Sequence, residues 1–166
     1  IPVPEAEDPE RPLTDIGLAE AEFTANGLVE YLGGEIAKST RRSMIFHSGV
    51  LRAQQTADVV AKAFIKAGWE TSCEQASHLG SRDSPIGACE LVKGARQEAV
   101  VLVGHLPHMG LLAAALLKSP ASAGRLVEAF SPASGIVLKR DGEQWVEATE
   151  IIVGTSWWTK FQTQSS

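Results

Sequence analysis

The sequence lacks the features that mark several large classes of protein. It holds only two cysteines, Cys73 and Cys89, which are too few and too widely spaced for a disulfide scaffold or a CxxC metal site. One disulfide between the two cysteines is still an alternative, so the cysteines do not identify the redox compartment. No apolar run approaches the ~18 residues that a membrane-spanning helix needs. The longest candidate, residues 109–117, is followed directly by Lys118.

Positive charge is also scarce. Fifteen Lys and Arg residues stand against twenty Asp and Glu residues, which gives a formal net charge of -5. A protein that works on DNA, RNA or an anionic membrane would be expected to carry a basic face. We therefore expect neither a nucleic-acid partner nor a membrane partner.

The rest of the composition is that of an ordinary globular protein. The 166 residues are 44% hydrophobic and 21% charged, which suits one folded domain. The chain opens on Ile1 rather than Met, and an initiator Met is normally trimmed only before a small residue. We therefore expect that a segment ahead of Ile1 was removed or omitted. We expect a cytoplasmic location, with a cleaved signal peptide as the alternative.

Hydrophobic periodicity predicts helices that alternate with strands. Helices are predicted near residues 14–32, 51–67, 85–93 and 107–118, with Gly33-Gly34 ending the first and Ser84-Pro85 opening the third. Short apolar runs predict strands near residues 43–46, 69–73 and 99–103. The last run is uniformly apolar, as expected of a strand buried on both faces. The second helix has an apolar face of Ala53, Ala57, Val60 and Phe64.

The last third of the chain changes character. Two strand-like runs, at residues 136–139 and 145–153, flank Asp141 and Gly142, a dipeptide that favours a hairpin turn. Alternating strands and helices followed by an antiparallel hairpin predict one α/β domain with a mixed sheet.

Two strand-to-helix junctions carry the residues that are best suited to chemistry. In an open α/β sheet, ligands bind at the carboxyl ends of the strands, where helix N-termini offer free N–H groups. Arg52 follows one junction and His105 follows the other. A guanidinium can bind two phosphate oxygens through parallel N–H donors, and an imidazole can donate a proton or a hydrogen bond. Together they predict a pocket for a phosphorylated ligand.

From about Val3 to Ile152 the chain resembles the histidine phosphatase superfamily, and within it the SixA-type phosphohistidine phosphatases. The pieces that carry the resemblance, in order, are Arg11-Pro-Leu-Thr-Asp-Ile-Gly17, His47-Ser-Gly-Val-Leu-Arg-Ala-Gln-Gln-Thr-Ala57, Val103-Gly-His-Leu-Pro107 and Ser134-Gly-Ile-Val137. The resemblance implies a phosphoglycerate mutase-like fold, a three-layer α/β sandwich with a mixed, mostly parallel sheet. Residues 1–153 would form this domain, and residues 154–166 would be a C-terminal extension.

The resemblance also implies roles for individual residues. Arg52 would bind the phosphoryl oxygens, His105 would stabilise charge in the transition state, and Ser48 would line the same pocket. Asp83 lies in the loop where some members carry an acidic proton donor. No metal or other cofactor is implied, and the substrate would be a phosphorylated protein or a small phosphorylated molecule.

One family feature is absent from the sequence. Members begin with a central strand that ends in Arg-His-Gly, whose histidine is the nucleophile, and this triplet does not occur in the 166 residues. Losing the nucleophile of a covalent mechanism removes nearly all of the chemical step. Two functions therefore stay open. One is a phosphatase of phosphohistidine or small phosphomonoesters, with that strand lying ahead of Ile1. The other is a non-catalytic phosphate-binding or scaffold protein of the same fold.

The missing strand has a structural consequence as well. Without it, two rows of backbone N–H and C=O groups would be buried unpaired, at roughly 1–3 kcal/mol per group. We expect the slot to be filled by the family's own strand, by residues 154–161, or by a rearranged sheet. Trp157 and Trp158 in this tail are alternatively a contact between two copies in a homodimer.

A metal site is the weaker interpretation of the histidines. His108 follows His105 at a spacing that can place two imidazoles on one side of a helix start, and His47 or His78 could add a third. Tight sites need three or four ligands with supporting hydrogen bonds, and no Cys or carboxylate stands at matching spacing. We therefore expect no metal.

Overall fold

The first helix shows how local sequence begins and ends an element. The computed structural model describes residues 9–105, 108–118 and 134–151, and in it α1 spans Asp15–Glu35. The Thr14 side chain caps the helix by accepting a hydrogen bond from the Gly17 N–H at 3.0 Å. The prediction that Gly33-Gly34 ends this helix is wrong. The helix continues to Glu35 because Leu32 and the following Ile36 pack against the core, which outweighs the entropic cost of glycine.

Three parallel strands form the centre of the molecule. They are β1 (Arg42–His47), β2 (Glu70–Gln75) and β3 (Ala99–Val103), in the order β2-β1-β3. Helix α2 (Leu51–Lys66) connects β1 to β2, and α3 (Pro85–Gly94) connects β2 to β3. All four residues of the predicted apolar face of α2 are buried. Helix α4 (His108–Leu116) follows β3.

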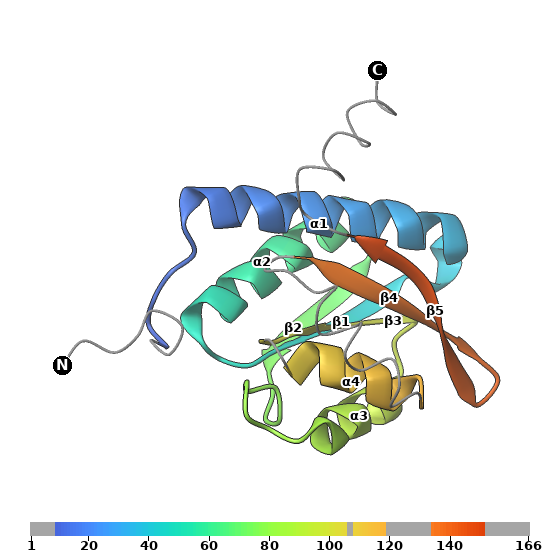
Figure 1. Ribbon diagram of the computed structural model, residues 1–166. Helices are drawn as coiled ribbons and strands as arrows, with labels where there is room; N and C mark the ends of the chain where they lie inside the picture. Colours follow the sequence, from blue (N-terminus) through green and yellow to red (C-terminus); the bar gives the residue numbers. More distant parts are fainter. Residues whose placement is uncertain (1–8, 106–107, 119–133, 152–166) are drawn as a thin grey trace.

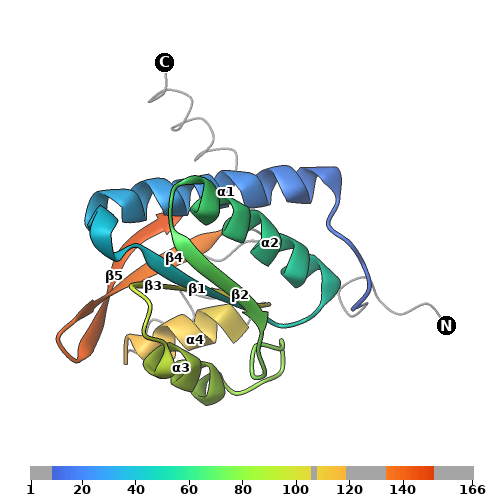
Figure 2. The same cartoon turned by 180° about the vertical axis from the view of Figure 1, so that it is seen from behind.

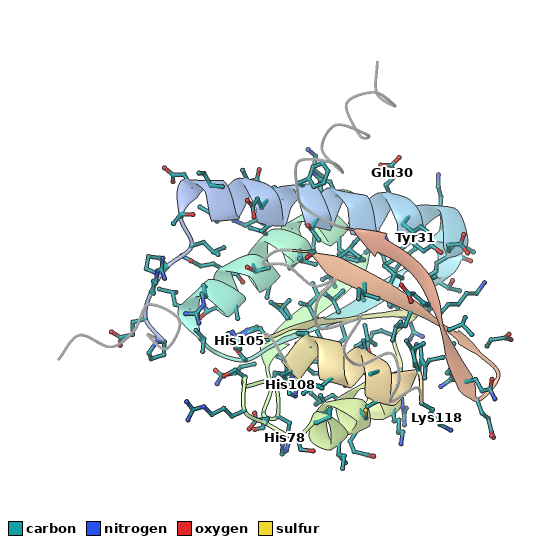
Figure 3. All side chains as sticks on the ribbon, in the orientation of Figure 1. Glu30, Tyr31, His78, His105, His108 and Lys118 are labelled. Carbon is teal, nitrogen blue, oxygen red and sulfur yellow. The ribbon has the colours of Figure 1, made fainter. Side chains whose placement is uncertain are left out.

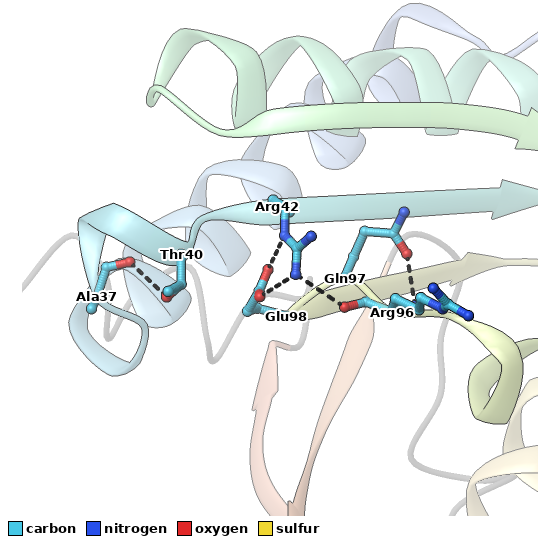
Figure 4. Close-up of polar contacts among 6 residues, drawn as sticks. All are labelled: Ala37, Thr40, Arg42, Arg96, Gln97 and Glu98. Atoms are coloured by element: carbon cyan, nitrogen blue, oxygen red, sulfur yellow. Dashed lines mark hydrogen bonds and ion pairs between the residues drawn. The ribbon is translucent and has the colours of Figure 1, made fainter.

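The amino ends of β1 and β3 are joined by side chains (Figure 4). The Arg42 guanidinium donates to both carboxylate oxygens of Glu98, at 3.1 and 2.8 Å, and also to the Arg96 carbonyl oxygen. The hydrogen bond from Arg42 lowers the pKa of Glu98 to about 2. This forked pair lies at the end of the sheet opposite to the strand–helix junctions that the sequence singled out. It therefore contributes to strand register and not to the site.

The predicted hairpin is present. Strand β4 (Gly135–Asp141) pairs antiparallel with β5 (Gln144–Ile151), and Gly142 in the turn has a φ of 65°. Asp141 belongs to the strand and pairs with Gln144, so the two turn residues are Gly142 and Glu143. Glycine at the first position of a two-residue turn is typical of type II′ geometry.

The elements form the three layers that the family resemblance implies (Figures 1 and 2). Helices α1 and α2 cover one face of the parallel sheet, and α3 and α4 cover the other. On the first face Ala25, Ile45 and Phe64 belong to one buried cluster. On the second face Phe46 and Leu112 belong to another.

Between β3 and β4 the sheet is interrupted. Within the described residues β3 pairs only with β1, and β4 pairs only with β5. Strands β1, β2 and β3 keep a regular parallel register, and which of the three expected ways fills this place stays a prediction. The prediction that β3 is buried on both faces is wrong. Only Ala99 is buried, and the other four residues are half-buried because one edge of β3 faces the gap.

One further prediction concerns a part of the chain outside this description, and another concerns the described helices. The proposed C-terminal extension, with Trp157 and Trp158, lies outside the described residues. Among the helices that are described, none is long and apolar enough to cross a bilayer.

Candidate functional site

The two junctions meet at one edge of the sheet. Strands β1 and β3 are parallel neighbours, and His47 at the end of β1 pairs with Val103 at the end of β3. The residues that follow are therefore brought together although they are far apart in sequence. The Ser48 hydroxyl oxygen lies 2.7 Å from Nε2 of His105, a hydrogen bond whose donor depends on the imidazole tautomer.

A tight turn after β1 places the N-terminus of α2 at this edge of the sheet. Gly49 has a φ of 88°, and a Cβ there would lie 2.3 Å from the Gln75 side chain, so the turn requires glycine. The Gly49 N–H donates to Nδ1 of the buried His47 at 3.2 Å, which holds the turn against the strand. Arg52 is consequently fixed in the first turn of α2.

Arg52 and His105 line one large cavity, together with Ser134 at the start of β4. The pKa of His105 is lowered from its usual 6.5, first by burial, then by the positive charge of Arg52, and third by His108. The His105 carbonyl accepts the Met109 N–H at 3.0 Å, so His105 lies just ahead of α4, where a helix N-terminus disfavours a cation. In the absence of a ligand, these surroundings favour the neutral imidazole of His105.

These groups form a donor set suited to an oxyanion. A guanidinium, a hydroxyl, an imidazole and the N-terminus of α2, which has no side-chain cap, converge on one edge of the sheet. Such donors are the ones that bind phosphate in proteins. An anion bound there would also offset the unfavourable proximity of Arg52 to a protonated His105.

The remaining histidines do not join this cluster. His108 is completely buried, and among the described residues neither of its ring nitrogens has a hydrogen-bond partner. Figure 3 shows His108 beside the start of α4 and His78 on the loop before α3. No three His, Cys, Asp or Glu side chains among the described residues are grouped as metal ligands would be.

Asp83 lies in the loop between β2 and α3. Its carboxylate accepts the Gly80 N–H at 2.8 Å, and its own N–H donates to the Gly80 carbonyl, so this exposed residue stabilises its own turn. It does not line the large cavity. A role for Asp83 as proton donor stays a prediction.

Two other residues at the site were not singled out from the sequence. Gly104 lets the loop before α3 approach β3, because a Cβ there would lie 3.1 Å from the Leu79 carbonyl oxygen. Glu20, a half-buried carboxylate on α1, lines the same cavity as Arg52 and His105. Neither position is distinguished by sequence alone, because helix α1 is brought to this edge only by the tertiary fold.

Comparison with known proteins gives similarity of structure but not of sequence. No protein-family model and no curated protein sequence matches the chain. Among solved structures, a proposed phosphohistidine phosphatase SixA from Agrobacterium tumefaciens matches with a TM-score of 0.70 and 20% identity, over 93% of this chain and 91% of that one.

Two further structures extend this similarity. A phosphoglycerate mutase from Plasmodium falciparum matches with a TM-score of 0.59 and 19% identity, over 82% of this chain and 83% of that one. A mycobacterial glucosyl-3-phosphoglycerate phosphatase in complex with VO3 matches with a TM-score of 0.51 and 18% identity, over 84% and 87%. The chain therefore has the SixA-like, phosphoglycerate mutase-like α/β fold of the histidine phosphatases.

Proposed function

We propose that the protein binds phosphoryl groups through Ser48, Arg52 and His105 and is a SixA-like phosphatase of phosphohistidine or small phosphomonoesters. The observation that carries the proposal is the 2.7 Å contact between Ser48 and His105, where His105 lines the same cavity as Arg52. The proposed partners are accordingly a phosphorylated protein or a small phosphorylated molecule, and the proposed compartment is the cytoplasm.

The three side chains have distinct proposed roles. Arg52 binds two phosphoryl oxygens with its forked donors, and Ser48 donates to a third. His105, held by Ser48, takes up a proton as the dianion enters and stabilises the charge that develops on the transferring group. The transfer itself requires a nucleophile, which the family resemblance assigns to the histidine of Arg-His-Gly. Turnover therefore depends on a strand carrying that triplet in the same polypeptide.

A second candidate function is favoured by one specific observation. The 166 residues contain no Arg-His-Gly triplet. A chain without it would keep the Ser48, Arg52 and His105 cluster and would be a non-catalytic phosphate-binding or scaffold protein.

Hydrolysis of an aryl phosphate separates the two functions. For a phosphatase, Arg52→Ala and His105→Ala should each reduce kcat/KM by at least about 100-fold, as is usual when a group that stabilises transition-state charge is removed. Arg96→Ala is the matched control, because Arg96 is an exposed arginine at the opposite end of β3. Equal rates in all three variants would contradict the site. No turnover by the wild type, with phosphate still raising its Tm, would identify the non-catalytic binder.

A further inference from the structure

A groove of about 470 Å³ lies on the face of the sheet that α3 and α4 cover. Strands β1 and β2 border it on one side, and the carboxyl-terminal half of α3 borders it on the other. We call it the α3 groove, and it is lined by Met44, Phe46, Glu74, Glu90, Leu91 and residues 94–97. Ser48, Arg52 and His105 do not line it. A ligand in this groove would therefore leave the phosphoryl site open.

The α3 groove exists because α3 leaves part of the sheet uncovered. Met44 and Phe46 of β1 pair with Ser72 and Glu74 of β2, so these four side chains point to the same face. Phe46 is buried and Met44 is half-buried, whereas Ser72 and Glu74 are exposed. Within the described residues, α3 therefore packs over β1 and stops short of β2.

The floor of the α3 groove is apolar. Met44 and Phe46 line it from the sheet and Leu91 lines it from α3, and all three belong to one apolar cluster. Met44 and Leu91 are only half-buried, so part of their apolar surface is open to a ligand. A methionine in such a position adapts its shape to the group that packs on it. The floor therefore suits an aliphatic chain.

The rim of the α3 groove is negatively charged on both sides. Glu74 lies on the β2 side and Glu90 on the α3 side, and both are exposed. Helix α3 also ends here, at Gly94, and a helix C-terminus carries a partial negative charge. Lys93 lies 3.6 Å from the Glu90 carboxylate, but both side chains are about two-thirds exposed, and such a pair contributes little. The Glu90 carboxylate is therefore available to a cation from another molecule.

The positive charge in the α3 groove is at one end. Among the described residues that line the groove, Arg96 is the only cation, and it lies at the amino end of β3. Its N–H donates to the Gln97 side chain and its carbonyl accepts from Arg42, which holds its backbone in place. Figure 4 shows its guanidinium extending away from the pair of Arg42 and Glu98. Because Glu74 lies near the carboxyl end of β2, a bound cation is held at the carboxylate end and repelled from Arg96.

We propose that the α3 groove binds an arginine side chain within a short apolar segment of a partner polypeptide. The aliphatic stem of that arginine lies on Met44 and Leu91, and its guanidinium lies between Glu74 and Glu90. A planar guanidinium with several N–H donors can bind two carboxylates at once, which an ammonium does less well. Three residues of extended chain, at about 3.4 Å by 4.8 Å by 10 Å each, occupy roughly 490 Å³. The groove therefore has room for the residues on either side of the arginine.

Two peptides that differ only in charge test the proposal. Calorimetry measures binding of Ac-Ala-Leu-Arg-Leu-Ala-NH2 to the 166-residue chain, and the matched control peptide carries citrulline, which has the shape of arginine without its charge. The arginine peptide should bind one site at least about tenfold more tightly than the citrulline peptide at low ionic strength. Raising NaCl to about 0.5 M should narrow this difference, because exposed charges are screened.

Four surface variants locate the binding. Glu74→Gln and Glu90→Gln should each weaken binding of the arginine peptide about threefold, as expected for an exposed ion pair, and the double variant about tenfold. Lys93→Gln should strengthen binding about twofold, because it removes the cation that competes for Glu90. Glu22→Gln is the matched control, since Glu22 is an exposed carboxylate on α1, on the opposite face of the sheet. Its affinity for the peptide should equal that of the wild type.

Several results would overturn the proposal. Equal affinity of the wild type for the arginine and citrulline peptides would exclude recognition of the guanidinium. Equal affinity of the wild type and the double variant of Glu74 and Glu90 would place the peptide elsewhere on the protein. Absence of binding at millimolar peptide would exclude the site altogether. Binding of butylguanidinium as tight as that of the peptide would assign the groove to a small cation instead of a polypeptide.

Discussion

Ser48 Oγ and His105 Nε2 lie 2.7 Å apart although 57 positions separate the two residues in the sequence. The contact exists because β1 and β3 are parallel neighbours that end at the same edge. Burial lowers the pKa of His105, and the positive charge of Arg52, in the first turn of the helix after β1, lowers it further. We therefore expect the three residues to respond together to a bound negative charge.

The first prediction concerns anion affinity and pH. Burial and Arg52 hold the pKa of free His105 below 6.5, whereas a bound anion favours the protonated ring and raises it. Sulfate, which does not itself titrate near neutral pH, should therefore bind more tightly as pH falls. The gain is up to about tenfold per pH unit between the bound and free pKa values, and it levels off below the free value.

Calorimetric titration of sulfate between pH 5 and 8 measures this dependence. His105→Gln should bind weakly and with a nearly flat pH profile. A wild-type affinity that does not change over this range would exclude His105 from the anion site.

The second prediction compares two buried histidines. Within the part of the chain that the structure describes, His108 has no partner for either ring nitrogen, whereas Nδ1 of His47 accepts the Gly49 N–H. Replacing an unsatisfied buried polar group by an apolar one removes a desolvation cost of about 1–3 kcal/mol. His108→Leu should therefore raise the free energy of unfolding by about 1 kcal/mol, and His47→Leu should lower it. Urea denaturation measures both. A loss of stability in His108→Leu would show that this ring has a partner in solution.

The third prediction concerns the Arg42–Glu98 pair. Its hydrogen bond lowers the pKa of Glu98 from 4.5 to about 2, so the folded state binds this proton less readily than the unfolded state. The resulting stabilisation is fully present above pH 4.5 and is lost as pH falls toward 2. Because the pair is exposed, the effect is small. The urea midpoints of wild type and Glu98→Gln should differ at pH 6 and converge near pH 2; a constant difference would contradict this assignment.

Much of the fold follows from local sequence. The buried face of α2, the Ser84 cap and Pro85 start of α3, and the glycine turn of the β4–β5 hairpin were all predicted, because each depends on residues within one element. The end of α1 was wrong because packing beyond Gly34 decided it. Burial of β3 was wrong because it depends on a neighbouring strand, which no property of the β3 sequence reveals.

The proximity of the candidate site residues was predictable for a similar reason. Arg52 and His105 were expected to lie together because each follows a strand end, and strand ends of a parallel sheet meet, whereas Ser48 was added by the family resemblance. The burial of His108 and the cavity between β3 and β4 depend on how α1, α4 and the hairpin pack together. Hydrophobic periodicity predicts single helices and strands and carries no information about how these elements pack together.

Orthovanadate binding tests the central claim most directly, because vanadate mimics a phosphoryl group and needs no turnover to be detected. Calorimetry should show one site in the wild type, with affinity in Arg96→Ala unchanged and affinity in Arg52→Ala reduced by at least about tenfold, the loss expected for one charge-assisted contact. Equal vanadate affinity in wild type and Arg52→Ala, or no binding by the wild type at millimolar vanadate, would contradict a phosphoryl site at Ser48, Arg52 and His105.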